Sequence, residues 1–140
     1  MKLEADNLSL QLGGREILKE ISFTAEDPLT IILGKNGAGK TTLLKTIAGL
    51  YTPVQGTLTA GGKNLSRLSE RERAKLISYA PQDCQATDCL VLEFVVMGRN
   101  PYLKFWQMPG KKDYEDSKSA LDELGILSLA GRHMNELSGG

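Results

Sequence analysis

Long apolar runs are missing from this sequence, and so is an excess of charge of either sign. No stretch approaches the roughly 20 apolar residues of a membrane-spanning helix, and the opening residues lack the apolar core of a signal peptide. With 17 basic and 17 acidic residues, the formal net charge is zero, which argues against a nucleic-acid-binding surface. These absences predict a cytoplasmic chain.

Cysteine and histidine are also scarce. The two cysteines, Cys84 and Cys89, are typical of ordinary thiols in a reducing compartment, and the single histidine, His133, is remote from them in sequence. We therefore expect neither a disulfide framework nor a metal site built from these side chains.

A phosphate-binding pattern is present. Residues 34–41 read Gly-Lys-Asn-Gly-Ala-Gly-Lys-Thr and match G-x-x-x-x-G-K-[ST]; the apolar run at 29–33 predicts a buried strand before them, and a helix is predicted after them. Backbone N–H groups, the helix N-terminus and the Lys40 ammonium would converge on phosphate, and Thr41 offers a hydroxyl to Mg²⁺. The alternative, a glycine-rich turn with an exposed lysine, is disfavoured by these flanks. The candidate nucleotide ligands are Gly34, Lys35, Asn36, Gly37, Ala38, Gly39, Lys40, Thr41 and Thr42.

The rest of the sequence predicts short elements around a core, which 140 residues with 41% hydrophobic content can form. Alternation and turn residues predict extended segments at 8–12, 17–23, 56–60 and 77–80, the first two as a hairpin. Apolar spacing predicts helices at 42–50, 91–97 and 113–124, and Ser69 to Glu72 forms a capping box before a further short helix. On the last predicted helix, Tyr114, Leu121 and Leu124 share the apolar face.

Two further segments narrow the family. Tyr79-Ala80-Pro81-Gln82 follows the first part of the chain, and Leu137-Ser138-Gly139-Gly140 stands at its end. With the phosphate loop, in this order, they make the whole chain strongly resemble the ATP-binding subunit of ATP-binding cassette (ABC) transporters. Taken singly, Gln82 is typical of a solvated side chain and Ser-Gly-Gly of a flexible tail. Their order and spacing favour the functional interpretation.

This resemblance implies an α/β fold, the ABC-type nucleotide-binding domain of P-loop NTPases, with antiparallel β hairpins. It implies a nucleotide-binding core at 1–88 and a helical subdomain at 89–140 that ends in the signature motif. ATP and Mg²⁺ are the implied cofactors, with Gln82 sensing the ion and the γ-phosphate and linking them to the membrane-spanning partner. The signature residues, which would contact ATP held by a second copy, are Leu137, Ser138, Gly139 and Gly140.

Residues 95–102, with 112–124 after them, resemble the importer subfamily that takes up iron–siderophore, haem or cobalamin complexes. That resemblance implies a homodimer of ATPase subunits with membrane-spanning permeases, served indirectly by a substrate-binding protein. It places the subunit peripherally on the cytoplasmic face of the inner membrane. Tyr102, Phe105 and Trp106 are interpreted in two ways, as a dock for a partner helix or as packing between the two subdomains.

Two departures from the family pattern matter. Leu12 stands where the family usually places an aromatic that stacks on adenine. These residues also lack three features of the family: the strand that ends in the Mg²⁺-organising aspartate, the catalytic glutamate and the switch histidine. Asp122-Glu123 is interpreted as a pair on a helix surface and not as a substitute for them. We therefore expect an N-terminal fragment with no catalytic residue of its own. The alternatives are a nucleotide-binding module without turnover and a soluble ABC protein of translation or DNA repair.

Overall fold

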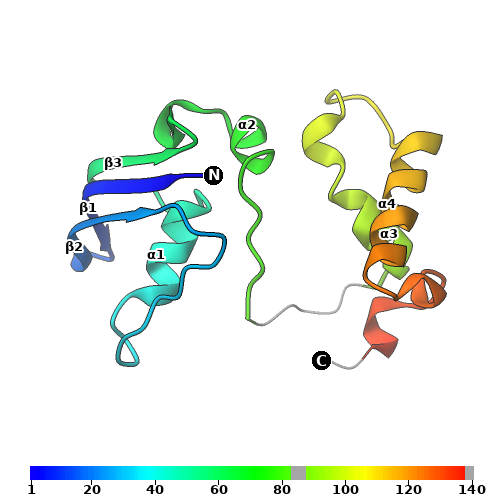
Figure 1. Cartoon of the computed structure of the whole chain (residues 1–140), viewed down its shortest axis with the longest axis horizontal. Coiled ribbons are helices and arrows are strands. Elements are labelled where there is room, and N and C mark those ends of the chain that lie inside the picture. Colours follow the sequence, from blue (N-terminus) through cyan, green and yellow to red (C-terminus); the bar gives the residue numbers. More distant parts are fainter. Residues whose placement is uncertain (83–87, 138–140) are drawn as a thin grey trace. The chain divides into compact units, whose positions relative to one another are not determined.

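The computed structural model describes residues 1–82 and 88–137, which belong to two compact units, Met1–Tyr79 and Ala80–Gly140. The first unit holds a sheet and helix α1, and the second holds helices α3 and α4 (Figure 1). The functional division into 1–88 and 89–140 stays a prediction.

The first unit is built on the predicted hairpin. Strands β1 (Leu3–Leu12) and β2 (Arg15–Ala25) pair antiparallel, with Leu3 opposite Ala25 and Leu12 opposite Arg15. Gly13 and Gly14 form the two-residue turn, the connection that suits the natural twist of paired strands. Leucines that alternate along the hairpin face one side, so Leu8, Leu10 and Leu18 are buried.

Two more strands and a helix complete this unit. Strand β3 (Gln55–Ala60) pairs with β1, and β4 (Lys63–Asn64) pairs with β3, so the sheet order is β2-β1-β3-β4. Helix α1 (Lys40–Ile47) contributes Leu43 and Ile47 to the core. The buried core residues of the unit are Ala5, Leu8, Leu10, Leu18, Leu43, Ile47, Leu58, Ala60 and Leu65.

A short 3₁₀ turn (Leu65–Arg67) and helix α2 (Glu70–Ala74) follow the sheet. The predicted capping box is confirmed. The Glu72 N–H donates to the Ser69 hydroxyl at 3.3 Å, and the Ser69 N–H donates to the Glu72 carboxylate at 2.9 Å. This reciprocal pair starts a helix of five residues, none of which is buried.

Two predicted strands are not formed. Residues 29–33 and 77–80 have no strand pairing, and Leu29, Ile31 and Leu33 are 76%, 69% and 87% exposed. The prediction of a buried strand before the phosphate loop was therefore wrong for the described structure. A strand is stabilised by hydrogen bonds to a neighbour, and no segment among residues 1–82 and 88–137 pairs with either run.

The second unit is helical, as predicted. Helix α3 (Val91–Met97) packs against α4 (Lys111–Glu123), and 3₁₀ turns lie at Asn100–Tyr102, Leu127–Leu129 and Met134–Glu136. No helix in the described parts of the chain has the length and apolar character to cross a bilayer. The buried apolar residues of this unit are Val91, Val96, Leu103 and Leu121.

The apolar face predicted for α4 was only partly correct. Leu121 is buried, but Tyr114 is 40% and Leu124 73% exposed. Ser117 takes the second buried position, and its hydroxyl donates to the Asp113 carbonyl at 2.7 Å. A small side chain satisfied by its own helix can be buried without a missing hydrogen bond, which the apolar pattern alone does not predict.

Candidate nucleotide-binding site

The phosphate-loop residues lead directly into α1. The Ala38 N–H donates to the Lys35 carbonyl at 3.2 Å, which turns the loop back, and the Leu43 N–H donates to the Gly39 carbonyl at 2.8 Å. Gly39 is the N-cap, and no side chain caps the helix. The N–H groups of the first turn therefore keep the partial positive charge of a helix N-terminus and can donate to an anion.

Gly39 is required by conformation and by space. Its φ is +88°, in the left-handed region that residues with a Cβ rarely adopt. A Cβ there would lie 3.1 Å from the Ile17 carbonyl oxygen and 3.1 Å from a Leu18 methyl group, both on β2. Strand β2 of the hairpin thus packs directly against the phosphate loop at Gly39. The sequence predicts that the hairpin packs beside the nucleotide site, but no local pattern shows that residues 17 and 18 are the ones that contact residue 39.

The Lys40 side chain folds back over the loop. Its ammonium donates to the Gly34 carbonyl at 2.7 Å and to the Lys35 carbonyl at 2.7 Å. An ammonium has three donors, so one remains for a ligand beside the two loop bonds. The loop therefore holds a positive charge next to the uncapped helix end, an arrangement that suits a phosphate group.

The threonines after Lys40 have different surroundings. Thr41 is exposed, so its hydroxyl is accessible to an ion bound with the phosphates, whereas Thr42 is half-buried. The Thr42 carbonyl accepts a hydrogen bond from the Thr46 hydroxyl at 2.8 Å. The structure thus brings residues 34–42 together at one end of α1.

The remaining predicted site residues are not assembled in this way. Gln82 is exposed and belongs to the second unit, and Leu137 is half-buried after the last 3₁₀ turn of that unit. Ser138, Gly139 and Gly140 lie outside the described residues. The roles of Gln82 and of the signature motif therefore stay predictions.

Leu12 stands at the end of β1, opposite Arg15, and is half-buried against the core of the first unit. Part of its surface is thus already covered by protein. The described structure shows an aliphatic, partly packed surface at this position, and its contact with a base stays a prediction.

The side chains considered for metal or acid–base chemistry have ordinary surroundings. His133 Nδ1 lies 3.2 Å from an Asp88 carboxylate oxygen, and Cys89 is a free thiol. Asp122 and Glu123 are exposed on α4. Among residues 1–82 and 88–137, no three His, Cys, Asp or Glu side chains come together in a way that could hold a metal ion. Cys84 lies outside the described residues.

The ABC transporter family profile matches residues 18–140. A Helicobacter pylori protein described as a "probable iron chelatin transport ATP-binding protein" is 41% identical over 143 residues, which are 100% of this chain and 56% of that protein. The hemin import ATP-binding protein HmuV of Bordetella avium is 39% identical over 142 residues, 100% of this chain and 53% of that protein.

A solved structure of a nucleotide-free ATP-binding cassette from an ABC transporter matches with a TM-score of 0.79 and 25% identity, over 99% of this chain and 60% of that one. The chain spans about half the length of the curated relatives it matches. The predicted fold class, an ABC-type nucleotide-binding domain of the P-loop NTPases, is confirmed by these matches. With its phosphate loop seated at the N-terminus of α1, the chain belongs to the ABC transporter family.

Proposed function

We propose that this chain is the ATP-binding part of an ATPase subunit that energises import of a metal chelate, such as an iron–siderophore, haem or cobalamin complex. The observation that carries the proposal is the Lys40 ammonium, held over the phosphate loop beside the uncapped end of α1. Relatives named for iron chelatin transport and hemin import support the substrate class.

The residues present fit a triphosphate. Gly39 brings the backbone close without a side chain, the first-turn N–H groups have no capping side chain, and Lys40 supplies the cation. Thr41 would offer one oxygen to Mg²⁺ and Gln82 another, while the ion compensates charge on the phosphates. The proposed ligands are Gly34, Lys35, Asn36, Gly37, Ala38, Gly39, Lys40, Thr41, Thr42 and Gln82.

The proposal extends to the assembly. Two copies would close head to tail around ATP, with Leu137 and the Ser-Gly-Gly that follows it on the γ-phosphate of the opposite copy. Gln82 would report occupancy to a membrane-spanning permease at the cytoplasmic face of the inner membrane. Hydrolysis of ATP by the whole protein would then reopen the pair, mainly through positioning and charge stabilisation.

The test is ATP affinity in two matched lysine variants of one helix. Lys40→Ala removes the ammonium above the loop, and Lys45→Ala removes the same charge from the last turn of α1, where it lies 5.9 Å from the Tyr51 ring centre. We expect Lys40→Ala to weaken ATP binding at least tenfold, about 1.4 kcal/mol. Lys45→Ala should stay within about twofold of the parent, because Lys45 is only half-buried and lies in the last turn of α1, so salt screens its charge.

Calorimetric titration with ATP, with and without Mg²⁺, measures both variants. Equal affinity of Lys40→Ala and the parent would show that nucleotide does not bind at this loop. Equal losses in both variants would show only general attraction between the anion and a basic surface. Either result would remove the basis for the proposed function.

A further inference from the structure

The second unit exposes large apolar side chains on the segment between the 3₁₀ turn Asn100–Tyr102 and α4. Leu103 is buried, with 6% exposed, and anchors this segment to its unit. Directly after it, Phe105 is 99%, Trp106 80% and Met108 82% exposed. These three side chains form one apolar tip, which we define as residues 105–108. Three large apolar side chains exposed within four residues make this segment a candidate interaction site.

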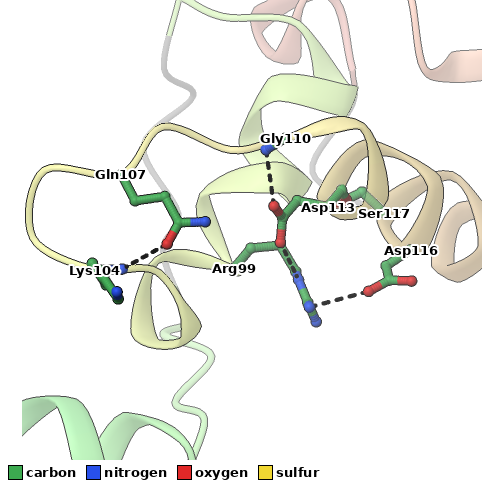
Figure 2. A network of polar contacts seen from close by, with 7 residues as sticks. All are labelled: Arg99, Lys104, Gln107, Gly110, Asp113, Asp116 and Ser117. Carbon is green, nitrogen blue, oxygen red and sulfur yellow. Dashed lines mark hydrogen bonds and ion pairs between the residues drawn. The ribbon is translucent and has the colours of Figure 1, made fainter.

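The tip is a closed turn. The Gln107 N–H donates to the Lys104 carbonyl at 2.8 Å. The Lys104 N–H donates to the Gln107 side-chain oxygen at 3.2 Å (Figure 2). Phe105 and Trp106 therefore occupy the two corner positions. Turn corners favour small or polar residues such as Gly, Asn, Asp and Ser, so two large aromatics there are not explained by the turn itself.

The two ends of the segment are held by ion pairs. Figure 2 shows the Arg99 guanidinium lying between two carboxylates of α4, 3.1 Å from Asp113 and 3.0 Å from Asp116. Asp113 also accepts the Gly110 N–H at 2.9 Å. The tip therefore projects from a fixed base, so presenting it to a partner requires little additional ordering.

The charges around the tip are basic. Residues 94–112 contain no Asp or Glu, and Arg99 is balanced by its two carboxylates. Lys111 lies 3.6 Å from Glu115, whereas Lys104 and Lys112 have no ion pair with any described residue. Two lysines without a counter-charge therefore flank an aromatic tip. Aromatics at headgroup level with lysines reaching lipid phosphates are the typical composition of a lipid-facing surface.

We propose that the apolar tip docks on an anionic lipid surface, with Phe105 and Trp106 at the headgroup boundary and Lys104 and Lys112 on the lipid phosphates. The tip is an exposed turn closed by its own hydrogen bonds, so it can enter a soft interface without a complementary pocket, which a protein partner would have to supply. The proposal does not require that the chain bind a nucleotide.

Trp106 is the only tryptophan of the chain and thus reports on the tip directly. Vesicles of phosphatidylcholine with phosphatidylglycerol should shift its fluorescence to shorter wavelength, and brominated lipid should quench it. Pure phosphatidylcholine should bind about thirtyfold more weakly, because two basic residues lose their anionic partners. Lys104→Glu with Lys112→Glu should reduce binding to anionic vesicles by at least the same factor.

Phe105→Ser keeps the reporter and should weaken binding about tenfold, whereas Leu124→Ser, at another exposed apolar residue of the unit, should leave it unchanged. Circular dichroism checks that each variant is folded, and vesicle flotation of Trp106→Ser tests the tip without relying on fluorescence. An unshifted Trp106 with anionic vesicles, equal binding to neutral vesicles, or an equal loss in Leu124→Ser would overturn the proposal. A shift that appears only with a polypeptide partner would assign the tip to a protein instead.

Discussion

Replacing Gly56 by alanine tests the packing of the sheet that supports the phosphate loop. Gly56 lies in β3 with φ +90°, beside the irregular pairing of β1 and β3 between Asp6 and Ser9. A Cβ at this position would collide with the Asn7 carbonyl oxygen and lie 2.5 Å from the Asp6 carbonyl oxygen. Both atoms are backbone, so no side-chain rotation can relieve the overlap.

The expected cost has two parts. An L residue in the left-handed region loses about 1–2 kcal/mol. Moving β1 away from the new methyl group resembles overpacking, which costs about 1–3 kcal/mol, and it lengthens hydrogen bonds between the two strands. We therefore expect Gly56→Ala to lower the free energy of unfolding by about 3 kcal/mol, a large share of the 5–15 kcal/mol typical of a domain.

Gly62→Ala is the matched control. Gly62 has φ +76° in the next turn, and a Cβ there would meet no atom within 4 Å. Gly62→Ala should lower the free energy of unfolding only by the conformational cost of the left-handed region, about 1 kcal/mol. Urea denaturation of both variants, followed by circular dichroism, gives the two free energies. Equal losses of unfolding free energy in the two variants would refute the reasoning, because they would show that the close approach of β1 to Gly56 does not add to the cost of a Cβ.

Three further outcomes are expected. Arg73→Met should cost about 2 kcal/mol in urea denaturation, because the Arg73 guanidinium donates to the Leu65 carbonyl at 2.8 Å and to the Gly49 carbonyl at 3.3 Å, and an unchanged midpoint would contradict this. Leu12→Tyr should tighten ATP binding by about 1–3 kcal/mol if adenine stacks there, and an unchanged affinity would place the base elsewhere. The Gly110 N–H and then the Arg99 guanidinium hold the pKa of Asp113 below its ordinary 3.8, so the stability that this carboxylate contributes is present above pH 3.8 and is lost as pH falls through the lowered pKa. A pH titration followed by proton NMR should show a higher Asp113 pKa in Arg99→Gln than in the parent. An unchanged pKa would show that the ion pair with Arg99 does not lower it.

The elements predicted correctly from the sequence are those with local causes. The Gly13-Gly14 turn, the Ser69–Glu72 capping box and the start of α1 after the phosphate loop depend on residues a few positions apart. Their hydrogen bonds join residues of the same short segment, so the local sequence is enough to predict them.

The failures have non-local causes. Residues 29–33 have the composition of a buried strand, yet a strand needs a partner, and sequence composition does not say which segment supplies it. The hairpin was expected beside the nucleotide site, but its contact with Gly39 through Ile17 and Leu18 could not be read from the sequence for the same reason. In the site, the loop could be predicted, whereas the two carbonyl partners of Lys40 depend on how the loop folds in space.

The uncovered run at 29–33 also affects how the purified chain behaves in solution. Its backbone N–H and C=O groups, flanked by uncharged side chains of which three are β-branched, can pair with the same run of another molecule. Association of this kind grows with protein concentration and adds strand to strand, so it leads to precipitation rather than to a defined oligomer. One lysine on the run, such as Ile31→Lys, would introduce charge repulsion between such copies and leave every phosphate-loop residue in place.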